Sequence, residues 1–275
     1  CYISDSVDQS VLNRMRKLIQ SIDVDALTMN IESLAECMFT HKWINPFPKF
    51  KYSERPDTAT AAILDGNIVI MVDNSPAVMI IPASIFDIIE EADDFNFSPM
   101  IGSYLRITRF FFSIVTWILT PLWLLFVNNP DWVPEFMKFV LITDDITVPV
   151  LLQLLILELA VDGLKLAAVN TPTMLSTPLS IVAGIVVGEY AVSSGWFNPE
   201  ALLYMAVTVG TYGQTNFEMG YAFKFLRVLT LILTQIFNLG GFIAGVVISV
   251  LMIAFNRTIT GKSYIYPLIP WDGKM

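Results

Sequence analysis

Ionisable side chains interrupt an apolar part of the chain at a spacing that could serve ion movement. Glu158, Asp162 and Lys165 follow i, i+4, i+7 spacing, so in a helix they share one face. An ionisable side chain in the hydrocarbon of a bilayer costs about 2.5–3.5 kcal/mol on insertion scales, and it usually faces a bundle interior or a water-filled path. We therefore expect these three residues to belong to an ion pathway or a gating element.

A structural role is the alternative for two of these residues. Asp162 and Lys165 are spaced to pair across one helical turn, which lowers the cost of burying both. They could equally mark the cytoplasmic end of a helix, with Lys165 reaching toward the membrane surface. Glu158 lies deeper in the apolar segment, so the functional interpretation is stronger for this residue.

A second apolar segment, residues 175–194, carries Glu189 and a row of small residues. Ser180, Gly184 and Gly188 recur at i+4 steps, a pattern that predicts close helix packing. Glu189 lies about 100° round the helix from Gly188. If that face lines a lumen, copies of Glu189 from several subunits would form an acidic ring, the usual device of a cation pathway.

Two further groups of charges flank apolar segments. Arg106 and Arg109 precede the first long apolar run, and we interpret them as anchors that keep the preceding residues in the cytoplasm. Glu218 lies with Lys224 and Arg227 at the expected inner end of the fourth apolar helix. These three residues could contribute to the ion pathway or form an interfacial salt-bridge set.

The composition favours a membrane protein with an acidic front piece. Hydrophobic residues make up 55% of the chain, charged residues make up 15%, and the net charge is −9. Residues 1–100 hold 15 acidic and 7 basic residues, whereas residues 101–275 hold 10 and 9. This split suggests a water-exposed piece followed by a membrane domain, and the acidic balance argues against a nucleic-acid partner.

Enzymatic chemistry is not expected. The chain contains no Gly-rich phosphate loop and no nucleophile motif. Cys1 and Cys37 are the only cysteines and His41 is the only histidine, without metal-ligand spacing. We therefore predict no catalytic residues, no metal and no cofactor.

The elements that must position the charged residues form three parts. The expected fold is a polytopic α-helical membrane protein with a partial N-terminal α/β cytoplasmic domain at residues 1–99. A membrane domain of four to six helical segments follows at residues 100–256, and a tail, expected in the cytoplasm, at residues 257–275. In the first part we predict helices over residues 8–20, 31–39, 58–64 and 84–95 and a β-hairpin of residues 67–72 and 77–81.

The membrane domain contains several apolar runs. The predicted spans are residues 104–127, 149–168, 175–194 and 200–217. The last run, residues 228–255, is interrupted by Asn238-Leu-Gly-Gly241. It could be one tilted helix or a tight helical hairpin, and the hairpin is favoured because it returns the basic tail to the cytoplasm.

Several motifs together resemble the A-subunit family of bacterial spore germinant receptors (GerA type). Glu158 and Asp162 match the family's two membrane acids. The motifs that carry the similarity, which extends over essentially the whole chain, are Glu54-Arg55-Pro56-Asp57, residues 68–76, Ile101-Gly-Ser-Tyr-Leu-Arg106, Asn216-Phe-Glu218 and residues 264–270. Residues 71–76, 171–173 and 267–274 resemble the branch of stage V sporulation protein AF. Family members have a longer N-terminal domain, so we expect Cys1 to be a truncation point.

The resemblance implies an oligomeric, pentameric ion channel in the spore inner membrane that releases cations during germination. Its partners would be copies of itself, membrane lipids, and either receptor B and C subunits or a small membrane protein. Glu189 stands where relatives are expected to carry Gln, so an acidic ring would be particular to this chain. A non-conducting receptor or scaffold subunit is the second interpretation, and a secondary transporter is the third.

Overall fold

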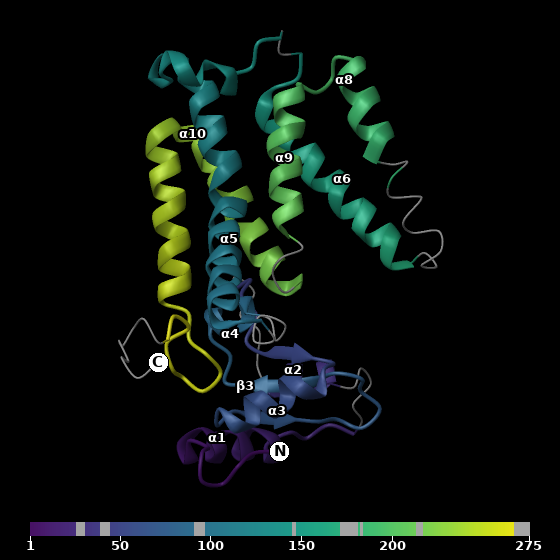
Figure 1. Ribbon diagram of the computed structural model, residues 1–275, viewed down its shortest axis with the longest axis vertical. Coiled ribbons are helices and arrows are strands. Elements are labelled where there is room, and N and C mark those ends of the chain that lie inside the picture. Colours follow the sequence, from purple (N-terminus) through teal and green to yellow (C-terminus); the bar gives the residue numbers. More distant parts are fainter. Residues whose placement is uncertain are drawn as a thin grey trace. The chain divides into compact units, whose positions relative to one another are not determined.

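The computed structural model describes residues 1–25, 31–38, 45–90, 97–144, 147–170, 181, 184–212 and 217–266. The chain divides into two compact units, residues 1–110 with 249–275, and residues 111–248. The described part is mostly helical and contains one small sheet (Figure 1). The elements are α1 (Gln9–Gln20), α2 (Ile31–Met38), β1 (Lys51–Ser53), α3 (Pro56–Leu64), β2 (Ile68–Ile70), β3 (Val78–Ile81), α4 (Ile85–Ile89), α5 (Pro99–Asn128), η2 (Pro130–Trp132), η3 (Glu135–Val140), α6 (Val150–Asn170), η4 (Val186–Tyr190), α8 (Ala191–Ser193), α9 (Pro199–Tyr212) and α10 (Phe217–Ala254).

The first unit contains a three-stranded antiparallel sheet in the order β1-β3-β2. The predicted hairpin of β2 and β3 is confirmed, with Ile70 opposite Met79. Asn74 takes a φ of 60° in the connecting turn, a conformation that Asn tolerates better than most residues. The sequence pattern missed β1, because a strand of three residues is too short for its alternation to stand out.

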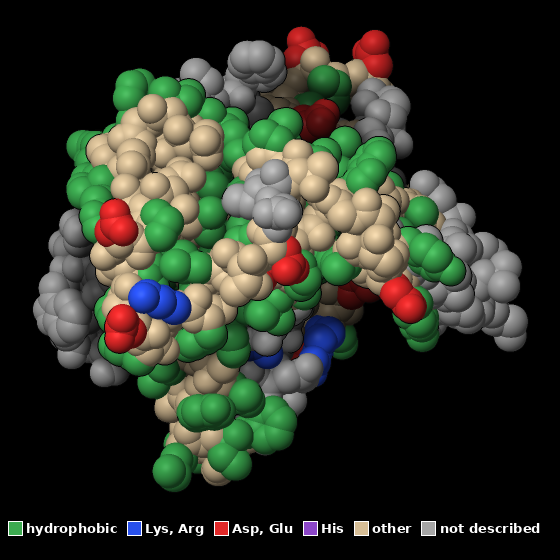
Figure 2. All heavy atoms as spheres, turned by 90° about the horizontal axis from the view of Figure 1, so that it is seen from above, with side chains coloured by type: hydrophobic (Ala, Val, Ile, Leu, Met, Phe, Trp, Pro, Cys, Tyr) green, Lys and Arg blue, Asp and Glu red, His purple; other side chains and the backbone are tan. Residues whose placement is uncertain are grey.

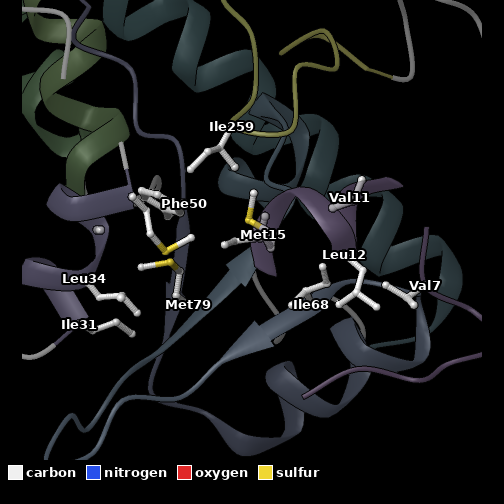
Figure 3. Packing of buried hydrophobic residues seen from close by; sticks show 13 residues of the cluster. Val7, Val11, Leu12, Met15, Ile31, Leu34, Phe50, Ile68, Met79 and Ile259 are labelled. Atoms are coloured by element: carbon white, nitrogen blue, oxygen red, sulfur yellow. The ribbon is translucent and has the colours of Figure 1, made fainter. Parts of the chain in front are cut away.

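Both faces of the sheet are covered, as the nearly continuous apolar strands predicted. Successive side chains of a strand point to opposite faces, and this separates Ile80 from its neighbours Met79 and Ile81. Ile80 and Val69 pack with the alanines of α3. The other face contributes to the main core, which also includes Val11, Leu12 and Met15 of α1, Ile31 and Leu34 of α2, Phe50 and Ile68 (Figure 3).

The described part of the C-terminal segment belongs to the same unit as the N-terminal piece. Ile259 is buried in the main core, where Figure 3 shows it near Phe50 and Met15. Tyr264 is fully buried, and its hydroxyl donates to Pro48 O at 2.9 Å. Residues 256–266 are therefore part of the folded first unit.

Helix ends in the first unit follow capping chemistry. The Asp8 side chain accepts from Ser10 N at 2.9 Å and caps α1. Ser84 and Asp87 form a capping box at the start of α4. The expected helix over residues 84–95 is shorter than predicted, because Glu90 is extended with a ψ of 141° and ends α4 at Ile89.

The second unit is a helical assembly. Its core forms where α5, α6, α9 and α10 meet, and the buried residues there are Trp123, Leu124, Val150, Leu154, Ala201 and Leu231. In the described part of the chain two helices are long and apolar enough to cross a membrane, α5 and residues 218–254 of α10. Figure 2 shows hydrophobic side chains over much of the face seen from above, with charged side chains scattered among them.

α10 reverses direction at Asn238, which confirms the predicted helical hairpin. Asn238 has non-helical angles, with φ 53° and ψ −130°. A Cβ added to Gly245 would lie 2.9 Å from Thr230 Cα, although a straight helix would separate these residues by about 22 Å. A Cβ on Gly241 would lie 1.8 Å from Leu233 O. The two arms, residues 217–237 and 239–254, therefore pack closely, and Figure 1 shows the reversal.

Candidate functional site

Four charged side chains of the second unit form one cluster, which we call the charge cluster: Glu158, Asp162, Lys224 and Arg227. Glu158 and Arg227 are buried, and Asp162 and Lys224 are partly buried. Glu158 lies in α6 with an exposed fraction of 5%, and Arg227 lies in the first arm of α10 with an exposed fraction of 0%. Arg227 Nε donates to Glu158 Oε1 at 2.6 Å, and Arg227 Nη2 pairs with the same oxygen. One oxygen of the Glu158 carboxylate is thus held by the guanidinium.

Lys224 joins the two acids of α6. Its Nζ lies 3.3 Å from Glu158 Oε2 and also pairs with Asp162 Oδ2. The same ammonium donates to the backbone oxygen of Glu158 at 3.2 Å. Because Glu158 and Asp162 are four residues apart, they occupy one face of α6, and Lys224 approaches that face from α10.

The charge cluster also reaches a third helix. Arg227 Nη1 donates to Thr116 O of α5 at 2.9 Å. A single arginine therefore links α5, α6 and α10 through its fixed fork of donors. The Arg227 side chain is fully buried. Movement of α5 or α6 relative to α10 would therefore have to break its hydrogen bonds to Thr116 or Glu158.

The charges within the cluster balance. Two carboxylates face one ammonium and one guanidinium, and such pairing offsets part of the cost of removing ions from water. A mobile cation could bind Glu158 or Asp162 only after Lys224 or Arg227 moves away. In this conformation the cluster acts as a clamp between helices.

The sequence interpretation placed Lys224 and Arg227 at the inner end of the fourth apolar helix, and this placement is wrong. Both residues lie within the first arm of α10 and are paired with the acids of α6. Lys224 and Arg227 are three residues apart, and the acids Glu158 and Asp162 are four residues apart. These spacings place each pair on one helix face, and they were the signal that could have indicated the pairing. Lys165 also lies in α6, and its Nζ is 5.9 Å from the centroid of the Tyr221 ring in α10. Glu218, at the start of α10, is half-buried.

Glu189 lies in η4, a π-helical segment, and its side chain is exposed. A Cβ added to Gly184 or Gly188 would meet no atom within 4 Å. Close packing at these two glycines is thus not found within the chain's described residues and stays a prediction. Ser180, the third residue of the predicted packing row, lies outside the described residues.

The predicted anchors Arg106 and Arg109 both lie in α5 and are half-buried. Arg106 Nε lies 3.8 Å from Glu90 Oε1, within the first unit. The role of Arg106 and Arg109 as anchors at the membrane boundary stays a prediction.

Sequence reasoning missed a polar contact at the start of α6. Gln153 is fully buried and donates through Nε2 to Asn198 Oδ1 at 2.7 Å, while Asn198 N donates to Gln153 Oε1 at 2.9 Å. Asn198 immediately precedes α9. This pair connects α6 and α9, and a single Gln in an otherwise apolar run was the signal that could have found it.

The family model of the Bacillus/Clostridium GerA spore germination protein matches residues 1–275. Stage V sporulation protein AF of Bacillus subtilis (strain 168) is 36% identical over 275 residues, covering 100% of this chain and 55% of that protein. Spore germination protein GerLA of Bacillus cereus is 26% identical, over 98% of this chain and 55% of that protein.

A third relative carries only a descriptive name. The uncharacterized membrane protein YfkQ of Bacillus subtilis (strain 168) is 26% identical, over 91% of this chain and 49% of that protein. The chain thus spans about half the length of these curated relatives. No solved structure matches this chain.

Proposed function

Because the chain belongs to the GerA family of spore germination proteins, we propose that it is a subunit of an oligomeric cation channel of the spore inner membrane. The subunit conducts cations during germination and so amplifies ion release. Several copies of the chain surround the ion pathway, and the family resemblance implies that there are five. Membrane lipids and other germination membrane proteins, such as receptor B and C subunits or a small membrane partner, complete the assembly.

The observation that carries the proposal is the exposed carboxylate of Glu189. It stands on an otherwise apolar stretch, residues 181–192, beside the open surface of Gly184 and Gly188. A charge exposed to lipid is costly, so such a residue faces water or another protein surface. Equivalent carboxylates from several subunits around a lumen would attract cations and exclude anions.

The charge cluster supports a gate in the same channel. Glu158 and Asp162 are neutralised by Lys224 and Arg227, so they do not present free charge to ions in this conformation. Separation of α6 from α10 would expose both carboxylates together. We assign the cluster to gating and Glu189 to the conduction pathway.

The proposed topology follows from the first unit. Ile259 and Tyr264 are buried together with residues of the N-terminal piece, so both ends of the apolar region lie on one side of the membrane. The number of crossings between α5 and the second arm of α10 is then even, four or six. Arg106 and Arg109 assign that side to the cytoplasm by the positive-inside tendency.

A non-conducting receptor or scaffold subunit is the second candidate, and one observation favours it. Arg227 ties three helices together, and such a rigid link could transmit a binding event to neighbouring proteins without forming a pore. The two candidate functions are distinguished by whether the protein conducts an ion current. The full-length protein, reconstituted in planar bilayers, should show single-channel cation currents, and their absence under all gating conditions would exclude the channel.

A further inference from the structure

The first unit contains a cavity of about 690 Å³ at the end of the second arm of α10. Arg14, Lys49 and Arg257 line it, and among the described residues that line it none is acidic. Met252, in the last turn of α10, and Phe255, directly after the helix, form part of its apolar wall. A concentration of three cations is unusual in a first unit whose sequence is strongly acidic, and it favours an anionic ligand.

Asn256, which lines the cavity, supplies an unused donor. It is 6% exposed, and its Oδ1 accepts from both Asn45 Nδ2, at 2.9 Å, and Lys49 Nζ. Two donors on one oxygen fix the orientation of the amide. The buried Nδ2 has no acceptor among the described residues, and a buried donor without an acceptor is unfavourable until one is present.

The surrounding contacts hold the cationic side chains in place. Lys49 is 5% exposed and donates to Arg257 O at 2.6 Å. Arg14 Nη1 donates to Thr260 O at 3.0 Å. It lies 2.9 Å from the position that a Cβ on Gly261 would take, and Gly261 has a φ of 85°. The backbone of this turn thus favours glycine at position 261.

We propose that this cavity binds the phosphate of an anionic phospholipid headgroup. Asn256 Nδ2 donates to a phosphate oxygen, Arg257 and Arg14 neutralise the charge, and Met252 and Phe255 contact the start of the acyl chains. Phe255 is 80% exposed at the end of an apolar helix arm, where the surface of a bilayer would lie. Basic pockets beside the ends of membrane helices are suited to such headgroups. The inference rests on the proposed crossing of the membrane by α10.

The test uses the full-length protein in detergent, with lipid adducts measured by native mass spectrometry. The probes are phosphatidylglycerol and phosphatidylcholine of the same acyl chains. We expect phosphatidylglycerol to bind about fivefold or more tightly, the effect of one basic residue near an anionic headgroup. Asn256→Asp keeps the acceptor for Lys49 but replaces the donor with a negative charge, so it should abolish this preference, and Arg257→Gln should reduce it.

Lys17→Gln is the matched control, because Lys17 is an exposed cation of α1 and is not among the residues that line the cavity. This variant should prefer phosphatidylglycerol over phosphatidylcholine as strongly as the wild type does. Equal binding of the two lipids, or an unchanged preference in Asn256→Asp, would overturn the proposal. Competition by inorganic phosphate that removes the lipid at equal concentration would assign the site to a free anion and would also overturn it. None of these outcomes bears on single-channel current, which tests the proposed function separately.

Discussion

The side chain of Arg227, in the charge cluster, is far less exposed to solvent than those of an ion pair on the surface. Arg227 has a side-chain exposure of 1%, whereas Lys138 and Glu135 form an ion pair with 60% and 93%. Exposed pairs contribute about 0–1 kcal/mol because water and salt screen them. Buried pairs contribute little net stability as a pair, but loss of one partner leaves a buried charge uncompensated.

Replacement of Arg227 by Met should therefore destabilise the second unit by about 3–5 kcal/mol, because Glu158 remains buried without its guanidinium. Thermal unfolding in detergent micelles measures this change. The double variant Glu158→Gln/Arg227→Met should recover part of the loss, and Lys138→Met should change stability by less than about 1 kcal/mol. A cost for Arg227→Met as small as that of Lys138→Met would contradict the clamp.

Asp8 makes the stability of the first unit depend on acid pH. Hydrogen bonds from Ser10 and Lys262 lower the pKa of Asp8 from 3.8 to about 2. Since the pKa is lower in the folded state, the stabilisation is present above pH 3.8 and is lost as the pH falls toward about 2. The side chain is 44% exposed, so the contribution is less than about 1 kcal/mol.

The variant Asp8→Asn keeps a good N-cap but cannot titrate. We expect its unfolding free energy to fall less steeply than that of the wild type between pH 3.8 and about 2. Chemical denaturation at a series of pH values measures the slope, with Asp5→Asn as the control in the same exposed turn. An unchanged slope in Asp8→Asn would show that the titrating group lies elsewhere.

Residue types and their roles were only partly predictable. The i, i+4 spacing of Glu158 and Asp162 located one side of the charge cluster, because helical periodicity is a local property. Their partners Lys224 and Arg227 come from more than sixty positions along the chain, and no local pattern encodes such a pairing. Lys49 was missed for the same reason, since its contacts lie in the C-terminal segment.

At the scale of elements, the hairpin of α10 depends on close contact between its two arms. Gly245 lies against Thr230, and Gly241 lies against the backbone of Leu233. Such approach needs residues without a side chain. The tip of the hairpin is tied to the end of α5, because Asn129 and Asn238 exchange side-chain hydrogen bonds of 2.6 and 2.9 Å.

Substitution at Gly245 should force the arms apart. A Val there would place its Cβ 2.9 Å from Thr230 Cα, and overpacking of this kind costs about 1–3 kcal/mol. Gly240→Val is the matched control, since a Cβ at Gly240 would meet nothing within 4 Å. Thermal unfolding in detergent should show a loss only for Gly245→Val, and equal losses would contradict the hairpin contact.

Elements with a strong local signal were predicted well. The Asn-Leu-Gly-Gly interruption predicted the reversal of α10, and the Asp-Asn-Ser-Pro turn predicted the β2–β3 hairpin. At Gly184 and Gly188 a Cβ would meet no atom of the described residues within 4 Å, so the packing predicted there from the same kind of pattern stays a prediction. Small residues indicate where close approach is possible, whereas tertiary structure decides which of those positions are used.

At the scale of the whole molecule, the proposed topology makes a direct prediction about sidedness. Cys37 and Lys262 belong to the first unit, whereas Trp196 is exposed in the turn between α8 and α9. An impermeant thiol reagent should label Cys37 and the thiol of Lys262→Cys from the same face of a sealed vesicle. It should label Trp196→Cys from the opposite face, in a Cys1→Ser background.

Labelling of Cys37 and Lys262→Cys from opposite faces would mean an odd number of crossings. That result would contradict the proposed topology, although the channel itself could still be tested by current. The wild-type Cys37 provides the internal control, because it reports the orientation of every vesicle preparation.

The most direct measurement is the reversal potential of single channels of the full-length protein in a potassium chloride gradient. The account predicts cation selectivity in the wild type and a clear shift toward zero in Glu189→Gln, because the variant removes the acidic ring. Glu135→Gln removes another exposed carboxylate, outside the apolar helices, and should keep the wild-type value. An unchanged reversal potential in Glu189→Gln would contradict the assignment of Glu189 to the conduction pathway.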